Sequence, residues 1–275
     1  MFHARQIKLC LSAIFFVGIA CWRALSGKAG SSLVILYYHG VASTKRANFA
    51  QQLASLENRA EIVPADFAGN GKTRRRRVAI TFDDGLTSVV ENAVPELLKR
   101  QMPFTIFFPT GSLGRTPSWE TEAAHDSQDP VMGSELLREL PAGLVTIGSH
   151  SVSHPHLTRI TIDDARREIA ESKSFLEHLT GQEVSLFAFP YGDLNDEVVD
   201  LCREAGFRHA YSIQPRIVNT LRSDFLRGRV SVNPDDGPIE FYLKASGAYA
   251  WLAVLASFRR RGRSTMSGLS PAAAK

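Results

Sequence analysis

The sequence predicts a parallel α/β fold, because short apolar strands alternate with amphipathic helices along most of the chain. The expected strands are Leu33–Tyr38, Val78–Phe82, Phe104–Phe108, Val145–Gly148, Leu186–Phe189 and Ala210–Ile213. Helical periodicity is clearest over Val89–Arg100 and Asp163–Leu179, and Thr161 with Asp164 three residues later is close to a capping box. About 250 residues remain after an N-terminal leader, which suits one barrel domain.

Two adjacent acids close the second expected strand, in the run Thr81-Phe82-Asp83-Asp84-Gly85. Consecutive strand residues point to opposite sides, so Asp83 and Asp84 share an environment only if the turn that Gly85 permits bends them together. We therefore expect the two carboxylates to have different roles in a site at the strand end. A plain turn followed by a helix N-cap is the alternative interpretation.

A pair of histidines follows another expected strand, in His150-Ser151-Val152-Ser153-His154. On a helical turn, positions i and i+4 lie on one face, so this spacing predicts that His150 and His154 bind one metal ion. Two histidines and one carboxylate, with positions left open for water and substrate, suit a hydrolytic metal site. Solvated or capping histidines are the alternative, and His156 falls outside the four-residue spacing.

A third motif ends the fifth expected strand, in Phe187-Ala188-Phe189-Pro190-Tyr191-Gly192, where proline and glycine indicate an unusual turn. If Tyr191 stands at the mouth of the site, its backbone N–H can stabilise a developing oxyanion while its ring lines the cleft. An ordinary corner between strand and loop is the alternative.

The three motifs come in the order, and at roughly the separations, found in polysaccharide deacetylases of carbohydrate esterase family 4. The chain resembles that family from about Leu33 to Val232. The resemblance implies a distorted (β/α) barrel and a divalent metal, with zinc expected and cobalt or nickel also compatible with the ligands. It also implies a role for each motif residue: Asp83 as general base, Asp84, His150 and His154 as metal ligands, and Tyr191 as an oxyanion contact.

Two features depart from the usual family pattern. The family commonly has an arginine shortly before the third motif to orient the base, but Ala188 and Phe189 occupy that stretch. Arg227 and Arg229 are candidates to replace it, unless both are simply solvated.

The second departure concerns the general acid, because the usual Leu-X-His motif near the C-terminus is missing. His39 ends the first apolar strand and would lie at the same rim as the other site residues if the strands are parallel. This arrangement resembles the circularly permuted branch that includes poly-N-acetylglucosamine deacetylases, in which an early strand carries the acid. We therefore expect His39 to be the acid, with a capping or buried structural role as the alternative.

The favoured function is metal-dependent removal of N-acetyl groups from N-acetylhexosamine units of an exopolysaccharide or cell-wall glycan. The long segment Thr110–Asp129 is expected to form one wall of the cleft, with Trp119 either stacking on a sugar or anchoring the loop. An O-acetyl esterase, or a deformylase or deacetylase acting on a lipid-linked sugar, is the second hypothesis. A non-catalytic carbohydrate-binding protein is the third, and the intact base and ligand candidates argue against it.

The termini bear on location. Arg5 and Lys8 precede an apolar run from Leu9 to Trp22, the layout of a signal peptide or membrane anchor over residues 1–28. That run is short for a spanning helix, which needs about 20 residues. We expect an exported protein, whether periplasmic, membrane-anchored or extracellular, with cleavage of the leader left open.

Residues 29–246 are expected to form the catalytic domain, followed by a basic amphipathic segment and flexible tail over residues 247–275. The basic run Arg259–Arg263 is either solvated or part of a helix that lies on anionic lipid. The net charge of +4 is modest and no nucleic-acid motif is present, so we expect no nucleic-acid partner. Cys202 stands alone in the expected mature domain and is predicted to be a small buried residue.

Overall fold

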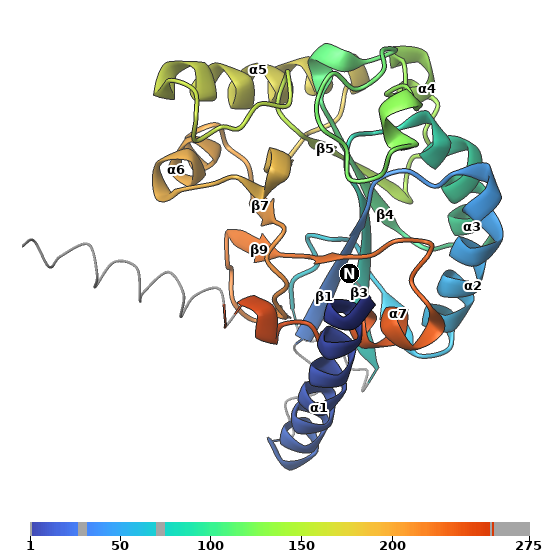
Figure 1. Cartoon of the computed structure of the whole chain (residues 1–275). Helices are drawn as coiled ribbons and strands as arrows, with labels where there is room; N and C mark the ends of the chain where they lie inside the picture. The colour runs from blue at the N-terminus through green and yellow to red at the C-terminus, as the bar shows by residue number, and fades with distance from the viewer. Residues whose placement is uncertain (1, 27–31, 70–74, 254, 256–275) are drawn as a thin grey trace, which may run out of the picture.

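A parallel sheet curls into a nearly closed barrel with helices on its outside (Figure 1). The computed structural model describes residues 2–26, 32–69, 75–253 and 255. The strand order is β10-β1-β3-β4-β5-β6-β7-β9, with β2 beside β3 and β8 antiparallel to β1. The strands are β1 Ser32–Tyr38, β2 Ala60–Ile62, β3 Arg76–Phe82, β4 Phe104–Phe108, β5 Val145–Ser149, β6 Leu186–Ala188, β7 His209–Ser212, β8 Val218–Asn219, β9 Leu226–Gly228 and β10 Val230–Ser231.

The helices alternate with these strands, and the order confirms the predicted barrel of parallel α/β units. The α-helices are α1 Phe2–Ser26, α2 Arg46–Glu57, α3 Val94–Lys99, α4 Ser134–Arg138, α5 Ile162–Thr180, α6 Asp196–Glu204 and α7 Pro238–Ala245. Short turns of other helix types are η2 Ser43–Lys45, η3 Val89–Ala93, η4 Thr110–Ser112, η5 Asp126–Gln128 and η6 Pro190–Gly192.

All six predicted strands are present, and the two clearest helices differ in regularity. Thr161 caps α5 by accepting a hydrogen bond from the Asp164 backbone N–H at 3.2 Å, as the sequence indicates. The stretch predicted as one helix over Val89–Arg100 is instead π-helical over η3 before it becomes α-helical in α3. Pro95 explains the change, because it lacks the N–H that an α-helical ladder would use there.

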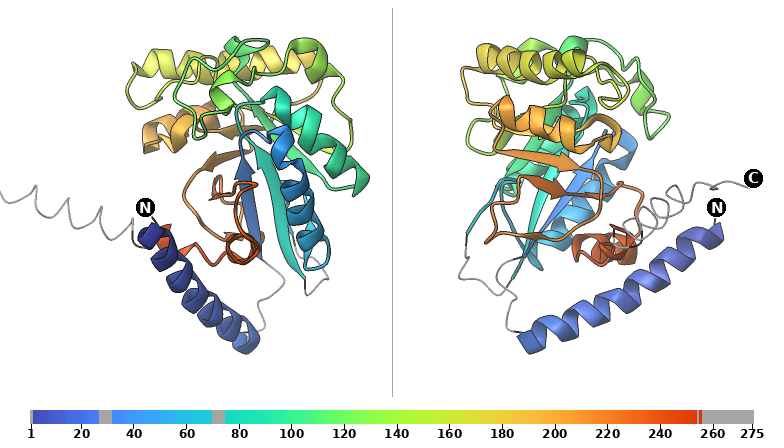
Figure 2. Two further views of the ribbon diagram at one scale, coloured as in Figure 1. Left: turned by 45° about the vertical axis from the view of Figure 1, so that its right-hand side comes forward. Right: turned by 90° about the vertical axis from the view of Figure 1, so that its left-hand side faces the viewer.

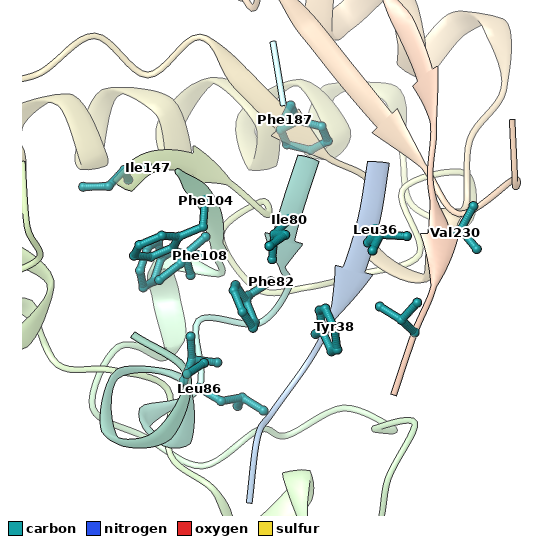
Figure 3. Packing of buried hydrophobic residues seen from close by; sticks show 14 of the residues in the cluster. Leu36, Tyr38, Ile80, Phe82, Leu86, Phe104, Phe108, Ile147, Phe187 and Val230 are labelled. Atoms are coloured by element: carbon teal, nitrogen blue, oxygen red, sulfur yellow. The ribbon is translucent and has the colours of Figure 1, made fainter. Parts of the chain in front are cut away.

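Strand alternation sorts the buried side chains into two clusters. Leu36, Ile80 and Phe82 belong to the larger cluster between sheet and helices, part of which Figure 3 shows on neighbouring strands. Ile35 and Ala79, one position away on the same strands, belong to a smaller cluster inside the barrel. Because side chains alternate with a period of two, the odd-numbered residues of β1 and β3 face the barrel interior.

The two edge strands of the nearly closed barrel are joined through a single residue. β9 pairs with β7 and β10 pairs with β1, and Arg229 alone separates β9 from β10 in the sequence. Its side chain is fully buried. The junction between the two edge strands, which we call the seam of the barrel, therefore places the Arg229 guanidinium inside the barrel.

The N-terminal helix α1 lies at the periphery of the molecule, against α7 and the segment after it (Figure 2). Arg5 donates to Glu240 at 2.8 Å, and the Trp251 indole donates to the Ser12 hydroxyl at 2.9 Å. Among the helices described, none combines the length and apolar character needed to cross a membrane.

Two other predictions concern the C-terminal part of the chain. Cys202 is buried, as predicted, and burial raises the pKa of its thiol. The predicted basic segment and tail over residues 247–275 lie largely outside the described residues.

Candidate active site

The two acids stand where β3 ends inside the barrel. Asp83 continues the inward-facing alternation of β3, and its backbone N–H donates to the Tyr38 carbonyl at 2.9 Å. Asp84 takes a left-handed φ of 64° and Gly85 one of 59°. A Cβ at Gly85 would lie 2.3 Å from a ring carbon of Phe108, so the turn has no room for a side chain. The turn therefore bends Asp83 and Asp84 together, as a shared site requires, and both carboxylates are buried in one pocket.

The two histidines come from a loop, so their predicted placement on a helical turn is wrong. β5 ends at Ser149, and the following loop has left-handed φ values of 68° at Ser151 and 60° at His154. The loop nonetheless brings both imidazoles to Asp84. The His154 Nε2 lies 3.3 Å and the His150 Nε2 3.7 Å from the Asp84 Oδ1.

Asp84, His150 and His154 fit a divalent metal. Their ligand atoms all lie within 4.8 Å of one another, and the buried Asp84 Oδ1 has no hydrogen-bond partner within the described structure. The His150 Nδ1 donates to the Ala188 carbonyl at 2.7 Å, which leaves the lone pair of Nε2 directed at the cluster. Two imidazole nitrogens and one carboxylate oxygen are donors that zinc and similar ions accept.

The pKa shifts of His150 and Asp84 suit metal binding. Burial lowers the pKa of His150 to about 4, so its imidazole is neutral near pH 7. Burial alone would raise the pKa of Asp84, but the nearby histidines, His154 foremost, lower it to about 2. The cluster thus offers a neutral imidazole at His150 and an ionised carboxylate at Asp84 near neutral pH.

Arg229 holds Asp83 from inside the barrel. The Arg229 Nη1 lies 2.6 Å from the Asp83 Oδ1 and Nη2 lies 2.8 Å from Oδ2, a bidentate pair with both side chains buried. Burial would raise the pKa of Asp83, but Arg229, together with His150, lowers it below its usual value. The guanidinium also lies 4.8 Å from the Tyr37 ring centre.

Solvation, one of the interpretations open for the two arginines, is therefore wrong for both. Arg227 is also buried, but it donates to the carbonyl oxygens of Ala65 at 2.7 Å and Phe67 at 3.2 Å. Arg227 therefore holds a loop in place, and Arg229 is the arginine that contacts Asp83, the candidate general base. The sequence contained a signal for this burial. One glycine separates the two arginines in an otherwise apolar stretch, and strand alternation places both side chains on one face.

His39 lies at the same rim as the acids, as predicted from its place at the end of β1. Its Nδ1 is 3.6 Å from a carboxylate oxygen of Glu122, a residue that the sequence analysis did not single out. Burial favours the neutral imidazole, but Asp84, Asp83 and Glu122 outweigh it and raise the pKa of His39 above its usual value. The environment therefore favours a protonated ring.

The turn at Tyr191 is more than an ordinary corner. Tyr191 has a left-handed φ of 57° within η6. Its ring stacks on His156 at 4.0 Å between centres and meets His154 edge-on at 4.6 Å. The ring therefore lines the pocket beside a histidine of the cluster, while His156 stacks on one of its faces.

These residues enclose a pocket of about 180 Å³. The predicted loop wall is present, since Trp119 to Glu122 line one side. Trp119 stacks on the His154 ring with 4.4 Å between centres, so it anchors the loop over a histidine of the cluster. A larger hollow of about 710 Å³ lies between α1, α7 and β10, but it gathers no comparable set of catalytic groups among the described residues.

Comparisons with known proteins agree with this fold. The family profile for polysaccharide deacetylase matches residues 70–210, so the chain belongs to the polysaccharide deacetylase family. The structure of IcaB from Ammonifex degensii is 28% identical, with a TM-score of 0.66 over 80% of this chain and 98% of that one. The Streptococcus pyogenes deacetylase PplD, 19% identical with a TM-score of 0.65 over 78% of this chain and 99% of that one, shares the fold.

Curated relatives match over a shorter stretch. The poly-beta-1,6-N-acetyl-D-glucosamine N-deacetylase of Staphylococcus aureus strain MRSA252 is 25% identical over 173 residues, which are 60% of this chain and 57% of that protein. YxkH of Bacillus subtilis is 26% identical over 163 residues, 59% of this chain and 54% of that protein. The chain thus spans about half the length of the curated relatives it matches.

Proposed function

We propose that the chain is a metal-dependent deacetylase that removes N-acetyl groups from N-acetylglucosamine units of an exopolysaccharide or cell-wall glycan. The observation that carries the proposal is the composition of the pocket. Asp83 is hydrogen-bonded to Arg229 and lies beside the cluster of Asp84, His150 and His154. Relatives named as poly-beta-1,6-N-acetyl-D-glucosamine N-deacetylases support the choice of substrate.

Asp84, His150 and His154 would hold the metal, with zinc the expected ion and cobalt or nickel compatible. The metal, when bound, supplies a Lewis acid for the acetyl carbonyl and lowers the pKa of water. Asp83 acts as general base, since its ionised carboxylate can accept a proton from the water that attacks the carbonyl carbon. Arg229 keeps that carboxylate ionised and oriented.

His39 acts as the general acid. As the C–N bond breaks, its proton passes to the sugar nitrogen, which would otherwise leave as a strongly basic amide anion. The raised pKa of His39 supports this role, because the nearby carboxylates favour the protonated ring that the step requires. The products are acetate and a free amine on the sugar.

Tyr191 would serve through its backbone N–H as a contact for the oxyanion of the tetrahedral intermediate. The left-handed turn at this residue, in the wall of the pocket, motivates the assignment. A single contact of this type contributes about 3 to 4 kcal/mol to transition-state stabilisation.

The function is tested by acetate release from β-1,6-linked N-acetylglucosamine oligomers, with O-acetylated oligomers of the same length as the competing substrate. Metal content of the purified protein is measured in parallel. We expect acetate from the N-acetylated oligomer, and loss of both metal and acetate release in His150→Ala. Release from the O-acetylated oligomer alone would favour the esterase hypothesis, and no release with no bound metal would favour a binding protein.

The location that we propose is outside the cytoplasm, as a periplasmic, membrane-anchored or extracellular enzyme. Arg5 and Lys8 before the apolar run of residues 9–22, and an extracytoplasmic polymer as substrate, support it. Fractionation of a tagged full-length chain tests this, and recovery wholly in the cytosol would contradict it.

A further inference from the structure

The loop between the two histidines has a backbone that is unfavourable for its sequence. Ser151 and His154 both have left-handed φ values although neither is glycine. Such conformations persist only where surrounding contacts determine them. The contacts that hold residues 150–154 therefore decide whether His150 and His154 are placed to share one metal.

A single carboxylate from α5 holds the middle of this loop. The Glu168 Oε2 accepts hydrogen bonds from the backbone N–H groups of Val152 and Ser153, each at 2.8 Å. Its Oε1 accepts the Ser153 hydroxyl at 2.6 Å. All three donors belong to Val152 and Ser153, two of the three residues between the histidines. Hydrogen bonds to a charged acceptor are roughly twice as strong as neutral ones.

The opposite side of the loop is held by η4. The backbone N–H of Gly111 donates to the Val152 carbonyl at 2.8 Å, and that of Thr110 donates to the Ser151 carbonyl at 3.1 Å. A Cβ at Gly111 would lie only 3.0 Å from the Val152 oxygen, so this approach is already tight. The loop is thus clamped between backbone donors on one side and the Glu168 carboxylate on the other.

The helix that carries Glu168 is itself tied to the root of the loop. The Ser172 hydroxyl, one turn further along α5, lies 2.6 Å from the hydroxyl of Ser149, the residue directly before His150. Ile169 is fully buried in the core beneath the helix. Glu168 is therefore presented from a fixed support, which is what a positioning residue requires.

We propose that Glu168 is a positioning residue for the metal site and presets the distance between His150 and His154 before the metal binds. The inference rests on the proposed metal role of these two histidines and Asp84. Glu168 is not itself a ligand, because both its oxygens are occupied by the loop and it lines a separate surface hollow of about 410 Å³. Its loss lowers metal affinity without removing any ligand.

The test is zinc affinity of the full-length metal-free protein, measured by competition with a chromophoric chelator, for wild type, Glu168→Gln and Glu168→Ala. The matched control is Glu171→Gln, which lies on the same helix, lines the same hollow and is exposed. We expect zinc binding to weaken roughly 10- to 100-fold in the Glu168 variants, more in Ala than in Gln, and to stay at the wild-type value in the control. Saturating zinc should restore most of the turnover.

Two readouts separate this effect from general damage and from failure of the proposed function. Thermal melting of the metal-free variants and the absorption spectrum of their cobalt complexes report folding and ligand geometry, and Glu168→Gln keeps the test valid if the Ala variant does not fold. Unchanged zinc affinity in Glu168→Gln and Glu168→Ala, or an equal loss in Glu171→Gln, would overturn the inference while leaving the metal site intact. Absence of His150-dependent zinc binding in the wild type would overturn the proposed function and this inference together.

Discussion

The two halves of the pocket are built in different ways. Asp83 stands at the end of a central strand and is fixed by an ion pair with Arg229 inside the barrel. His150 and His154 lie in a loop with left-handed residues, which is fixed by backbone hydrogen bonds to Glu168 and η4 from outside the barrel. Damage to the first half should therefore change the chemistry of the base, and damage to the second should change metal affinity.

The largest effect should follow from Asp83→Asn, which keeps the shape of the side chain but removes the base. We expect kcat on N-acetylated oligomers to fall by about 10³- to 10⁴-fold. Zinc affinity should remain close to wild type, because the ligands are untouched. A chelator competition beside the kinetic assay checks both, and a fully active variant would refute the assignment of the base.

His39→Ala tests the acid against the leaving group. We expect about a 10²-fold loss on amide substrates and a much smaller loss on an activated aryl acetate, which needs little protonation to leave. The alkaline limb of the pH–rate profile should disappear as well, because the working form of His39 is protonated and is lost as the pH rises through its raised pKa. Equal losses on both substrates would show that His39 is not the acid.

Arg229→Gln tests whether the seam of the barrel controls the base. Without the guanidinium the pKa of Asp83 should rise, so the acidic limb of the pH–rate profile should move to higher pH. We expect a loss of roughly 10- to 100-fold in kcat near neutral pH. Arg227→Gln is the control, because it removes a buried arginine of the same segment whose side chain donates to loop carbonyls. A profile that moves equally in both variants would point to general destabilisation instead.

The smallest effect should come from Tyr191→Phe. The proposed oxyanion contact uses the backbone N–H, and phenylalanine keeps both the ring and that group. We expect kcat to change by less than about threefold, or roughly 0.6 kcal/mol. A loss above 30-fold in the same assay would place the hydroxyl, and not the backbone, in the reaction.

The difference between the two halves also explains what could be predicted from the sequence. The strands and the rim position of His39 follow from apolar runs and parallel order, which are local patterns. The histidine pair was recognised by spacing, yet the helical reason for it was wrong, because the loop depends on partners from α5 and η4. From the sequence, Arg229 could not be distinguished from Arg227 as the partner of the base. The distinction appears only in the folded barrel, where β10, which directly follows Arg229, pairs with β1.

The contact of α1 with the far end of the chain has a consequence for synthesis. Ser12 and its partner Trp251 are 239 positions apart, and Arg5 and Glu240 are 235 apart. Chains emerge from the ribosome N-terminus first, at about 5 to 20 residues per second. Until residues 240–251 have been made, α1 lacks these two partners, and any cellular factor that recognises apolar nascent segments meets it first.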